Sequence, residues 1–351
     1  MATDCPCVGN VVTDGLVFNG KESVDMAMVL PSTVLLLGAG FSRVAGSPLA
    51  RELFDIEVFA GANWREEVIG SVLDRWTRWR QDHSDEHAEA FVTHAYRQGY
   101  GWSDLVKYLG LVLAQDFVSW RAYGGRLKPE KHSLVSAQIP PGHDVFWSNI
   151  FRRYPERSVS AVVTTNFDIW IERGMRYRTT PRRKRFGFNY GIVGEMLHGQ
   201  PGFPLAEALH PTLVTGAIPL LKLHGSISWA IEQGKLVKYT DCRPAMRGDA
   251  AIVPPVHEKE IPSWLRSIWD EARTGLSAAE HWVVVGYSLP EYDTEIRRLL
   301  ASCAGPRKLT VDVFDVYPDP VVARLSDLLP QADVRPHGPI PEACGELGSL
   351  L

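Results

Sequence analysis

Short runs of branched apolar residues alternate along this chain with segments in which apolar residues recur every three or four positions. The runs are apolar on both sides, which predicts buried strands of a parallel sheet. We expect strands at Val34–Leu37, Ser160–Val163, Leu220–Leu223, Ala251–Val253, Trp282–Val285 and, as the last of the chain, Leu309–Val316. Because helical segments separate them, the order predicts an α/β fold with a mostly parallel sheet and helices on both faces.

Helical spacing predicts the connections. Ser47 followed by Pro48 is typical of a helix start, so we expect a helix over Pro48–Phe59. Residues 60 to about 155 show no strand pattern, which predicts a helical insertion. The other expected helices are Trp64–Trp79, His87–Tyr96, Asp104–Trp120 and Pro262–Ala279, and one capped by Asp319-Pro320. The chain then divides into a polar lead-in (1–31), one α/β domain (32–335) and a C-terminal tail (336–351).

Composition narrows the class of protein. The 351 residues are 45% hydrophobic and 22% charged with a net charge of −4, an ordinary globular balance that favours neither nucleic acid nor membrane as a partner. No apolar run approaches the ~18–20 residues that span a bilayer, and no signal-peptide pattern opens the chain. The five scattered cysteines lack the paired spacing of a zinc site. We therefore expect a reduced cytoplasmic protein without a metal.

The first strand ends in Gly38-Ala39-Gly40, followed by Phe41-Ser42. Glycines at this place permit either a tight strand-to-helix turn or the close approach of a phosphate to exposed N–H groups. The third glycine of the full dinucleotide fingerprint is missing, because Arg43 occupies its position. The turn alone leaves both interpretations open.

Polar residues follow two further strands. Asn166 and Asp168 are either an ordinary Asx turn or an amide and a carboxylate that hold a water and a ribose. His224, which precedes Gly225, is either a buried structural histidine or a proton acceptor at neutral pH.

Two later strand ends carry polar groups as well. Gly286-Tyr287-Ser288 offers a hydroxyl to a phosphate or ribose. Asp315 is either a solvent-facing residue or a ligand for ribose hydroxyls, as in dinucleotide-binding folds.

Two charged segments give weaker indications of function. The basic run Arg176–Arg185 is either a nucleic-acid patch or, as we favour in an acidic protein, a solvated loop or subunit contact. His257-Glu258-Lys259-Glu260 has no second histidine one turn on, which excludes a metalloprotease-type metal site there.

Taken in order, four motifs resemble the sirtuin superfamily, most closely its bacterial sirtuin-like branch of antiphage-defence and NAD-depleting effectors. They are Gly38-Ala39-Gly40-Phe41-Ser42, Thr165-Asn166-Phe167-Asp168, Lys222-Leu223-His224-Gly225-Ser226 and Gly286-Tyr287-Ser288-Leu289. Two further segments look typical of that branch: Ile268-Trp269-Asp270-Glu271-Ala272, and Val284–Pro290 followed by Asp293.

The resemblance implies a doubly wound, Rossmann-like fold that binds NAD in extended form. It places the pyrophosphate and nicotinamide side against the glycine turn and the second motif, and the adenosine half against the later strand ends. It makes Asn166, Asp168 and His224 catalytic, and it makes Gly38, Ala39, Gly40, Phe41, Ser42, Thr165, Gly286, Ser288 and Asp315 NAD-binding.

Departures from the family pattern shape the expected activity. Family deacylases carry a zinc module of four cysteines, which this chain cannot build, and a proline-aspartate-phenylalanine-arginine segment, where this chain has Gly46–Arg51. Ala251–Pro255 stands where an acyl-lysine-binding stretch is expected. These differences weigh against deacylation and leave NAD chemistry.

The sequence therefore predicts an NAD glycohydrolase that releases nicotinamide and ADP-ribose or its cyclic form, acting as a regulated defence effector. The alternatives are a non-catalytic NAD or ADP-ribose sensor and, third, an NAD-dependent deacylase or ADP-ribosyltransferase. A destructive activity needs control, so we expect a homo-oligomer or a regulatory protein partner. Nucleic acid is expected only through the Arg176–Arg185 loop or a partner.

Overall fold

The computed structural model describes most of a single α/β unit. The chain divides into two units, Met1–Leu30 and Pro31–Leu351, and every described residue belongs to the second. The described residues are 32–43, 45, 47–55, 63–99, 101–117, 120–123, 126–129, 159–172, 188–190, 196–198, 218–239, 241–254, 256 and 260–339. The predicted lead-in, the Arg176–Arg185 run, His257–Lys259 and the end of the predicted tail lie outside them.

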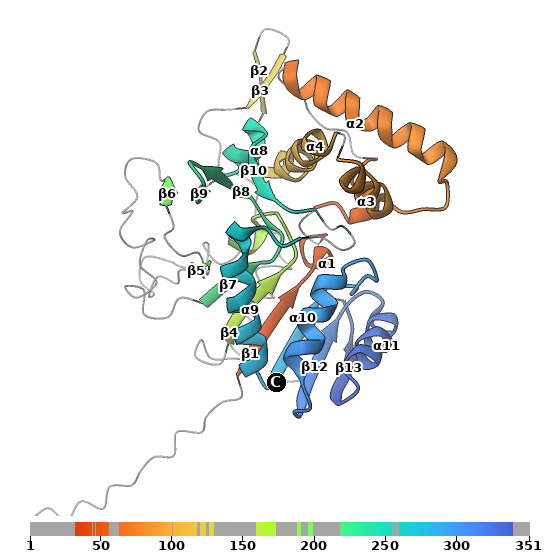
Figure 1. Ribbon diagram of the computed structural model, residues 1–351, viewed down its shortest axis with the longest axis vertical. Helices are drawn as coiled ribbons and strands as arrows, with labels where there is room; N and C mark the ends of the chain where they lie inside the picture. The colour runs from red at the N-terminus through yellow and green to blue at the C-terminus, as the bar shows by residue number, and fades with distance from the viewer. Residues whose placement is uncertain are drawn as a thin grey trace, which may run out of the picture. The chain divides into compact units, whose positions relative to one another are not determined.

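A seven-stranded parallel sheet forms the centre of this unit (Figure 1). Its order is β13-β12-β11-β1-β4-β7-β5, and every pairing in it is parallel. The strands are β1 (Thr33–Leu37), β4 (Val159–Thr164), β5 (Phe188–Asn189), β7 (Ile218–Lys222), β11 (His281–Val285), β12 (Leu309–Phe314) and β13 (Ala332–His337). Without the short β5, this is the doubly wound Rossmann order, whose direction reverses between β1 and β11.

Five predicted strands are confirmed as β1, β4, β7, β11 and β12. The expectation that β12 ends the sheet is wrong, because β13 follows as an edge strand. Val334 of β13 packs against the core while Asp333 and Arg335 are exposed, so the strand alternates where a fully buried strand would be apolar throughout.

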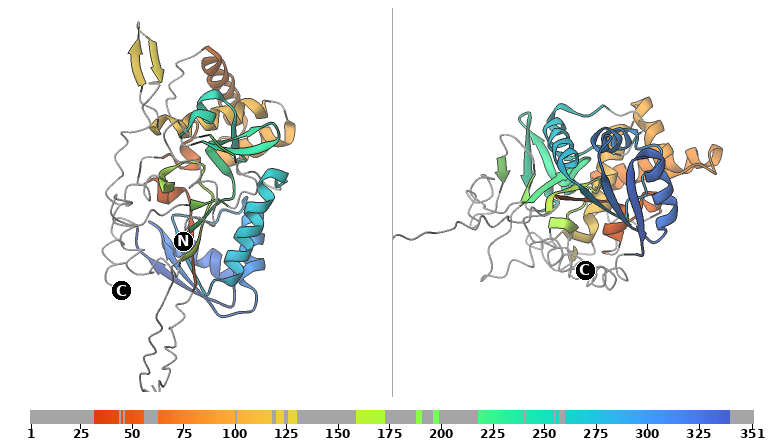
Figure 2. Two further views of the ribbon diagram at one scale, coloured as in Figure 1. Left: turned by 90° about the vertical axis from the view of Figure 1, so that its left-hand side faces the viewer. Right: turned by 90° about the horizontal axis from the view of Figure 1, so that it is seen from below.

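Helices α9 (Arg266–Ala278), α10 (Thr294–Ala304) and α11 (Pro318–Leu328) connect the strands from β7 to β13. Right-handed crossovers that all progress in one direction place them on one face, and the right-hand view of Figure 2 shows them along the sheet. The predicted helix Pro262–Ala279 is confirmed as a 3₁₀ turn, Ser263–Leu265, continued by α9. The predicted Asp319-Pro320 cap is wrong, because α11 already begins at Pro318 with Tyr317 at its N-cap.

The helical lobe, which we define as α2 (Asn63–Asp82), α3 (Ala88–Gln98) and α4 (Trp102–Ala114), lies beyond the carboxyl ends of the strands in Figure 1. Its core stacks aromatic rings: the Phe54 centroid lies 4.7 Å from that of Trp76 and 5.5 Å from that of Tyr108. Three predicted helices are thus confirmed, but α4 ends at Ala114 and gives way to the 3₁₀ turn Gln115–Phe117.

The expectation of no strand in this insertion is wrong. The antiparallel pair β2 (Trp120–Tyr123) and β3 (Arg126–Pro129) follows α4, and Trp120, taken as the end of a helix, begins β2. Aromatic residues suit a pleated surface as well as a helix face, so their spacing alone misassigns so short a pair.

A second sheet packs beside the lobe, in the order β10-β8-β9-β6. Its strands are β6 (Met196–His198), β8 (Gly225–Glu232), β9 (Lys235–Tyr239) and β10 (Ala250–Ile252), with α8 (Arg243–Arg247) between β9 and β10. The predicted strand at Ala251–Val253 corresponds to β10, which pairs antiparallel to β8 rather than joining the main sheet.

The predicted helix Pro48–Phe59 is wrong over its described part. After the short α1 (Ala39–Arg43), only the 3₁₀ turn Ala50–Glu52 forms. Ser47 cannot cap a helix, because its hydroxyl is buried and accepts a hydrogen bond from the Trp170 indole N–H at 3.0 Å. A distant tryptophan thus overrides the local capping signal.

Candidate functional site

The turn after β1 interlocks with the turn after β11. The Gly38 amide donates to the Val285 carbonyl at 3.0 Å, and the Gly40 amide donates to the Gly286 carbonyl at 2.8 Å. A Cβ at Gly38 would lie 2.5 Å from the Tyr287 Cα, and one at Gly40 would lie 2.8 Å from the Gly286 Cα. Both glycines are therefore required for the close approach of two backbones at the point where the strand order reverses.

These two hydrogen bonds occupy backbone N–H groups of the glycine turn that a ligand would otherwise use. The Phe41 amide also bonds within the turn, to the Gly38 carbonyl at 3.0 Å. The Ala39 amide, at the first position of α1, takes part in none of these bonds. The predicted phosphate contacts of Gly38 and Gly40 stay predictions, and the structure gives both glycines a packing reason that needs no ligand.

We expect Gly38→Ala to destabilise the protein by about 1–3 kcal/mol, because the new methyl group meets rigid backbone rather than a side chain that can move. The measurement is the free energy of unfolding in denaturant. The matched control is Gly70→Ala in α2, where a Cβ meets nothing within 4 Å. That change should stabilise by about 0.5–1 kcal/mol through helix propensity. Equal stability of Gly38→Ala and wild type would contradict the interlock.

Asn166 joins the second motif to the glycine turn. Its Nδ2 donates to the Gly38 carbonyl and to the Ser42 hydroxyl, each at 2.8 Å. Its own amide donates to the Thr164 hydroxyl at 3.1 Å, and that hydroxyl donates to the Leu37 carbonyl at 2.8 Å. Because both side-chain N–H groups are engaged, Oδ1 is the atom that remains to accept a hydrogen bond from a water.

Asp168 stands behind Asn166 and is fully buried. Its carboxylate accepts hydrogen bonds from the Ser42 hydroxyl and from the Trp170 amide, the latter at 3.0 Å. Burial raises the pKa of the Asp168 carboxyl, while the charge of Lys222 and these hydrogen bonds oppose the rise. Ser42 thus links Asp168 to Asn166.

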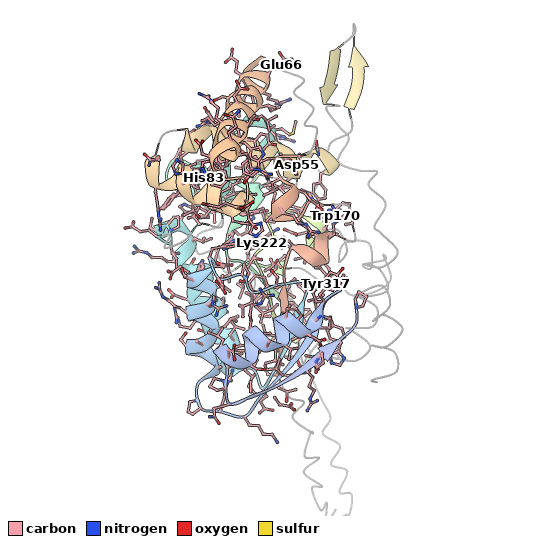
Figure 3. All side chains as sticks on the ribbon, turned by 90° about the vertical axis from the view of Figure 1, so that its right-hand side faces the viewer. Asp55, Glu66, His83, Trp170, Lys222 and Tyr317 are labelled. Atoms are coloured by element: carbon pink, nitrogen blue, oxygen red, sulfur yellow. The ribbon has the colours of Figure 1, made fainter. Side chains whose placement is uncertain are left out.

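Lys222 belongs to the third of the four motifs, but sequence reasoning assigned it no role, although a lysine inside the apolar run Leu220–Leu223 was a signal. It is completely buried at the end of β7. Its Nζ donates to the Asp168 carbonyl oxygen and lies 3.0 Å from Glu172 Oε1. In Figure 3 it lies at the level where the sheet meets the helical lobe. Lys222 therefore connects the second motif to the end of β7, two residues before His224.

His224 is held by its backbone and by its ring. Its carbonyl accepts from the Val253 amide at 2.8 Å. Gly225 follows at φ +80°, where a Cβ would lie 2.1 Å from the Ala251 carbonyl oxygen, so glycine is required there. The imidazole is 2% exposed and stacks on Phe167, with centroids 5.7 Å apart. This stacking brings His224 next to the residue that follows Asn166.

Asp293 is a second residue that was missed as part of the site, although the sequence placed it in a family-like segment. It is buried just before α10, and its Oδ1 lies 3.8 Å from His224 Nε2. Tyr287 donates to its other oxygen at 2.8 Å. Burial, together with the Asp293 carboxylate, raises the pKa of the Tyr287 hydroxyl well above its usual value, so this hydroxyl stays a donor.

The remaining predicted site residues are less closely connected to Asn166, Asp168 and His224. Phe41 is fully buried in the core, Thr165 is half-buried, and Ser288 is exposed. Asp315 follows β12 at the same sheet edge, and its Oδ1 accepts a local bond from the Tyr317 amide at 2.9 Å. Tyr317 is itself 75% exposed and lies at the periphery in Figure 3. The roles of these residues stay predictions.

Among the residues that the structure describes, no group of three or more His, Cys, Asp or Glu side chains is placed to hold a metal ion. Within the same residues, no helix combines the length and apolar character needed to cross a membrane.

Fold and site together define an α/β protein with a doubly wound parallel sheet, in which four polar strand-end turns meet where the strand order reverses.

By sequence, no family model and no curated protein matches the chain. Among solved structures the chain is similar to Sir2 proteins. One is in complex with the inhibitor EX-527, 2′-O-acetyl-ADP-ribose and a deacetylated p53 peptide; it is 13% identical, with 91% of this chain and 93% of that chain covered and a TM-score of 0.42. A Sir2 variant with deacetylated p53 peptide and 3′-O-acetyl-ADP-ribose is 12% identical, with 91% and 93% covered and a TM-score of 0.45. Sir2 with p53 peptide and NAD⁺ is 14% identical, with 91% and 94% covered and a TM-score of 0.39.

Proposed function

We propose that this protein is an NAD glycohydrolase that cleaves NAD to nicotinamide and ADP-ribose. One observation carries the proposal. At the carboxyl edge of a doubly wound sheet, the buried His224 stacks on Phe167, and Phe167 directly follows Asn166, whose side chain is held by two hydrogen bonds. Dinucleotides bind at this edge in such folds, where the strand order reverses. The four motifs that resemble sirtuins all contribute to this edge.

The proposed reaction breaks the bond between nicotinamide and ribose C1′. Nicotinamide leaves as a neutral ring because its nitrogen is cationic in NAD, and the ribose passes through an oxocarbenium-like transition state. Asn166 Oδ1 accepts a hydrogen bond from the attacking water and directs its oxygen at C1′. His224 takes the proton that the water loses. If a hydroxyl of the adenosine ribose attacks C1′ instead of water, nicotinamide leaves as before, His224 takes the proton of that hydroxyl, and the product is cyclic.

Asp168 acts in this proposal through its neighbours. Its carboxylate fixes the Ser42 hydroxyl, and that hydroxyl accepts from Asn166 Nδ2 at 2.8 Å. Asp168 and Ser42 therefore hold the asparagine at one orientation, with its oxygen turned away from the Gly38 carbonyl.

The test is a time course with the full-length protein and NAD that resolves nicotinamide, ADP-ribose and cyclic ADP-ribose. We expect nicotinamide to appear together with ADP-ribose or its cyclic form, without any added peptide. Calorimetric NAD binding with no product would favour a nucleotide sensor. Nicotinamide release strictly dependent on an acylated peptide or a protein acceptor would favour a deacylase or an ADP-ribosyltransferase. Either result would overturn the proposal.

We further propose that the activity is a cytoplasmic defence function held silent until triggered, by self-association or by a partner protein. This follows from the cost that NAD depletion imposes on the cell. Size-exclusion chromatography of the active and inactive forms tests it, and a constantly active monomer would contradict it.

A further inference from the structure

The loop between β11 and α10 places one buried carboxylate against His224. The Asp293 side chain is 4% exposed and the His224 side chain 2% exposed, so neither is screened by bulk water. The separation of 3.8 Å between Asp293 Oδ1 and His224 Nε2 is an ion-pair distance, longer than a hydrogen bond. Catalytic hydrogen bonds are often long without substrate and tighten when it binds.

We propose that Asp293 is the positioning residue of His224, an inference that rests on the proposed NAD cleavage. A carboxylate beside Nε2 favours the imidazole tautomer with its proton on Nε2, which leaves Nδ1 to accept the proton of the water. The same negative charge stabilises the imidazolium formed after the transfer. Carboxylates support catalytic histidines in this way in hydrolytic triads. Asp293 does not contact the reacting atoms and acts through His224.

The structure fixes this carboxylate from two sides. Tyr287, which is buried at the interlock with Gly38, donates to Asp293 Oδ2 at 2.8 Å and leaves Oδ1 toward the histidine. The neighbouring Tyr292 donates to Glu89 of α3 at 2.7 Å. The loop that carries Asp293 is therefore anchored both to the sheet and to the helical lobe.

The experiment compares wild type with Asp293→Asn and Tyr287→Phe in the full chain. We expect Asp293→Asn to lower kcat for NAD cleavage by about 10²–10⁴-fold with KM nearly unchanged, because the amide can present its donor to Nε2 and select the wrong tautomer. Tyr287→Phe keeps the carboxylate and removes one hydrogen bond to it, so a fall of about 10-fold is expected. The ¹⁵N shifts of the His224 imidazole, assigned by their absence in His224→Ala, report its tautomer. They should indicate the Nε2–H tautomer in wild type and depart from it in Asp293→Asn.

The matched control is Asp312→Asn. Asp312 is also a part-buried carboxylate bonded to a histidine, with Oδ2 at 2.6 Å from His281 Nε2, but it lies within β12. Its variant should lose stability and keep kcat. The proposal is overturned if Asp293→Asn folds and keeps both kcat and the tautomer, or, where Asp293→Asn does not fold, if Tyr287→Phe leaves both unchanged. The ¹⁵N shifts test the pair even if wild type releases no nicotinamide, so failure of the proposed activity remains distinguishable.

Discussion

His224→Ala is expected to lower the rate of nicotinamide release by about 10²–10⁴-fold, which is the scale of a lost general base. The reason is local, because the structure offers no second proton acceptor that stacks on Phe167 and faces Asp293 among the described residues. The fold should survive, since alanine keeps the backbone bonds that hold this position, including the 2.8 Å bond from the Val253 amide. Single-turnover kinetics with NAD measure the effect on chemistry apart from product release.

The control for this variant is His281→Ala. His281 begins β11, at the opposite end from the site, and is part-buried against Asp312. Its loss should lower the melting temperature and leave the rate of NAD cleavage unchanged. If His224→Ala and His281→Ala release nicotinamide at the same rate as wild type, His224 is not the base.

Most of the main sheet could be predicted because its strands are buried on both faces. Val34–Leu37 and Trp282–Val285 are continuous apolar runs, and burial of both faces is what such runs require. β13 could not be predicted in the same way, since an edge strand keeps polar residues on one side. The hairpin β8–β9 was also missed, because Ser226 and Ser228 resemble turn residues. In the structure their hydroxyls lie 3.0 Å apart and are buried in β8.

The site residues likewise divide into those that could be proposed from the sequence and those that could not. Asn166, Asp168 and His224 could be proposed from sequence because each follows an apolar strand, and parallel strands present their carboxyl ends at one edge. Asp293 lies beyond β11, in a loop whose path depends on the bond between Tyr287 and Asp293 and on the anchor to Glu89. No local pattern encodes that path. Ser42 was expected to contact the pyrophosphate, and that contact stays a prediction; its burial between Asn166 and Asp168 is a structural role that the sequence did not indicate.

The glycines illustrate why a motif and its role are separate questions. Gly38 and Gly40 match a phosphate-binding turn, yet their missing side chains are explained by backbone contact with Gly286 and Tyr287. That contact places Tyr287 where it donates to Asp293. The glycine turn is therefore linked, through Tyr287, to the carboxylate that we propose positions His224.

Replacing Asn166 is expected to cost activity and stability together. Asn166→Ala removes both donors of Nδ2, which leaves the buried Gly38 carbonyl without that bond and should destabilise by about 1–3 kcal/mol. It also removes the oxygen proposed to orient the water, so kcat should fall by about 10²–10⁴-fold. Asn166→Asp should lose as much activity, because a carboxylate oxygen would face the Gly38 carbonyl without a donor between them. Unfolding in denaturant and single-turnover NAD cleavage measure the two effects.

The matched control is Ser226→Ala, because Ser226 donates to the Phe167 carbonyl at 3.2 Å and thus supports the same motif without facing the proposed water. Its loss should reduce stability by about 1 kcal/mol and leave kcat nearly unchanged. If Asn166→Ala and Ser226→Ala show the same stability and the same kcat, Asn166 has only the structural role of holding the glycine turn in place. If its kcat falls far more than that of the control, the remaining oxygen acts on the substrate side, as the two engaged N–H groups imply.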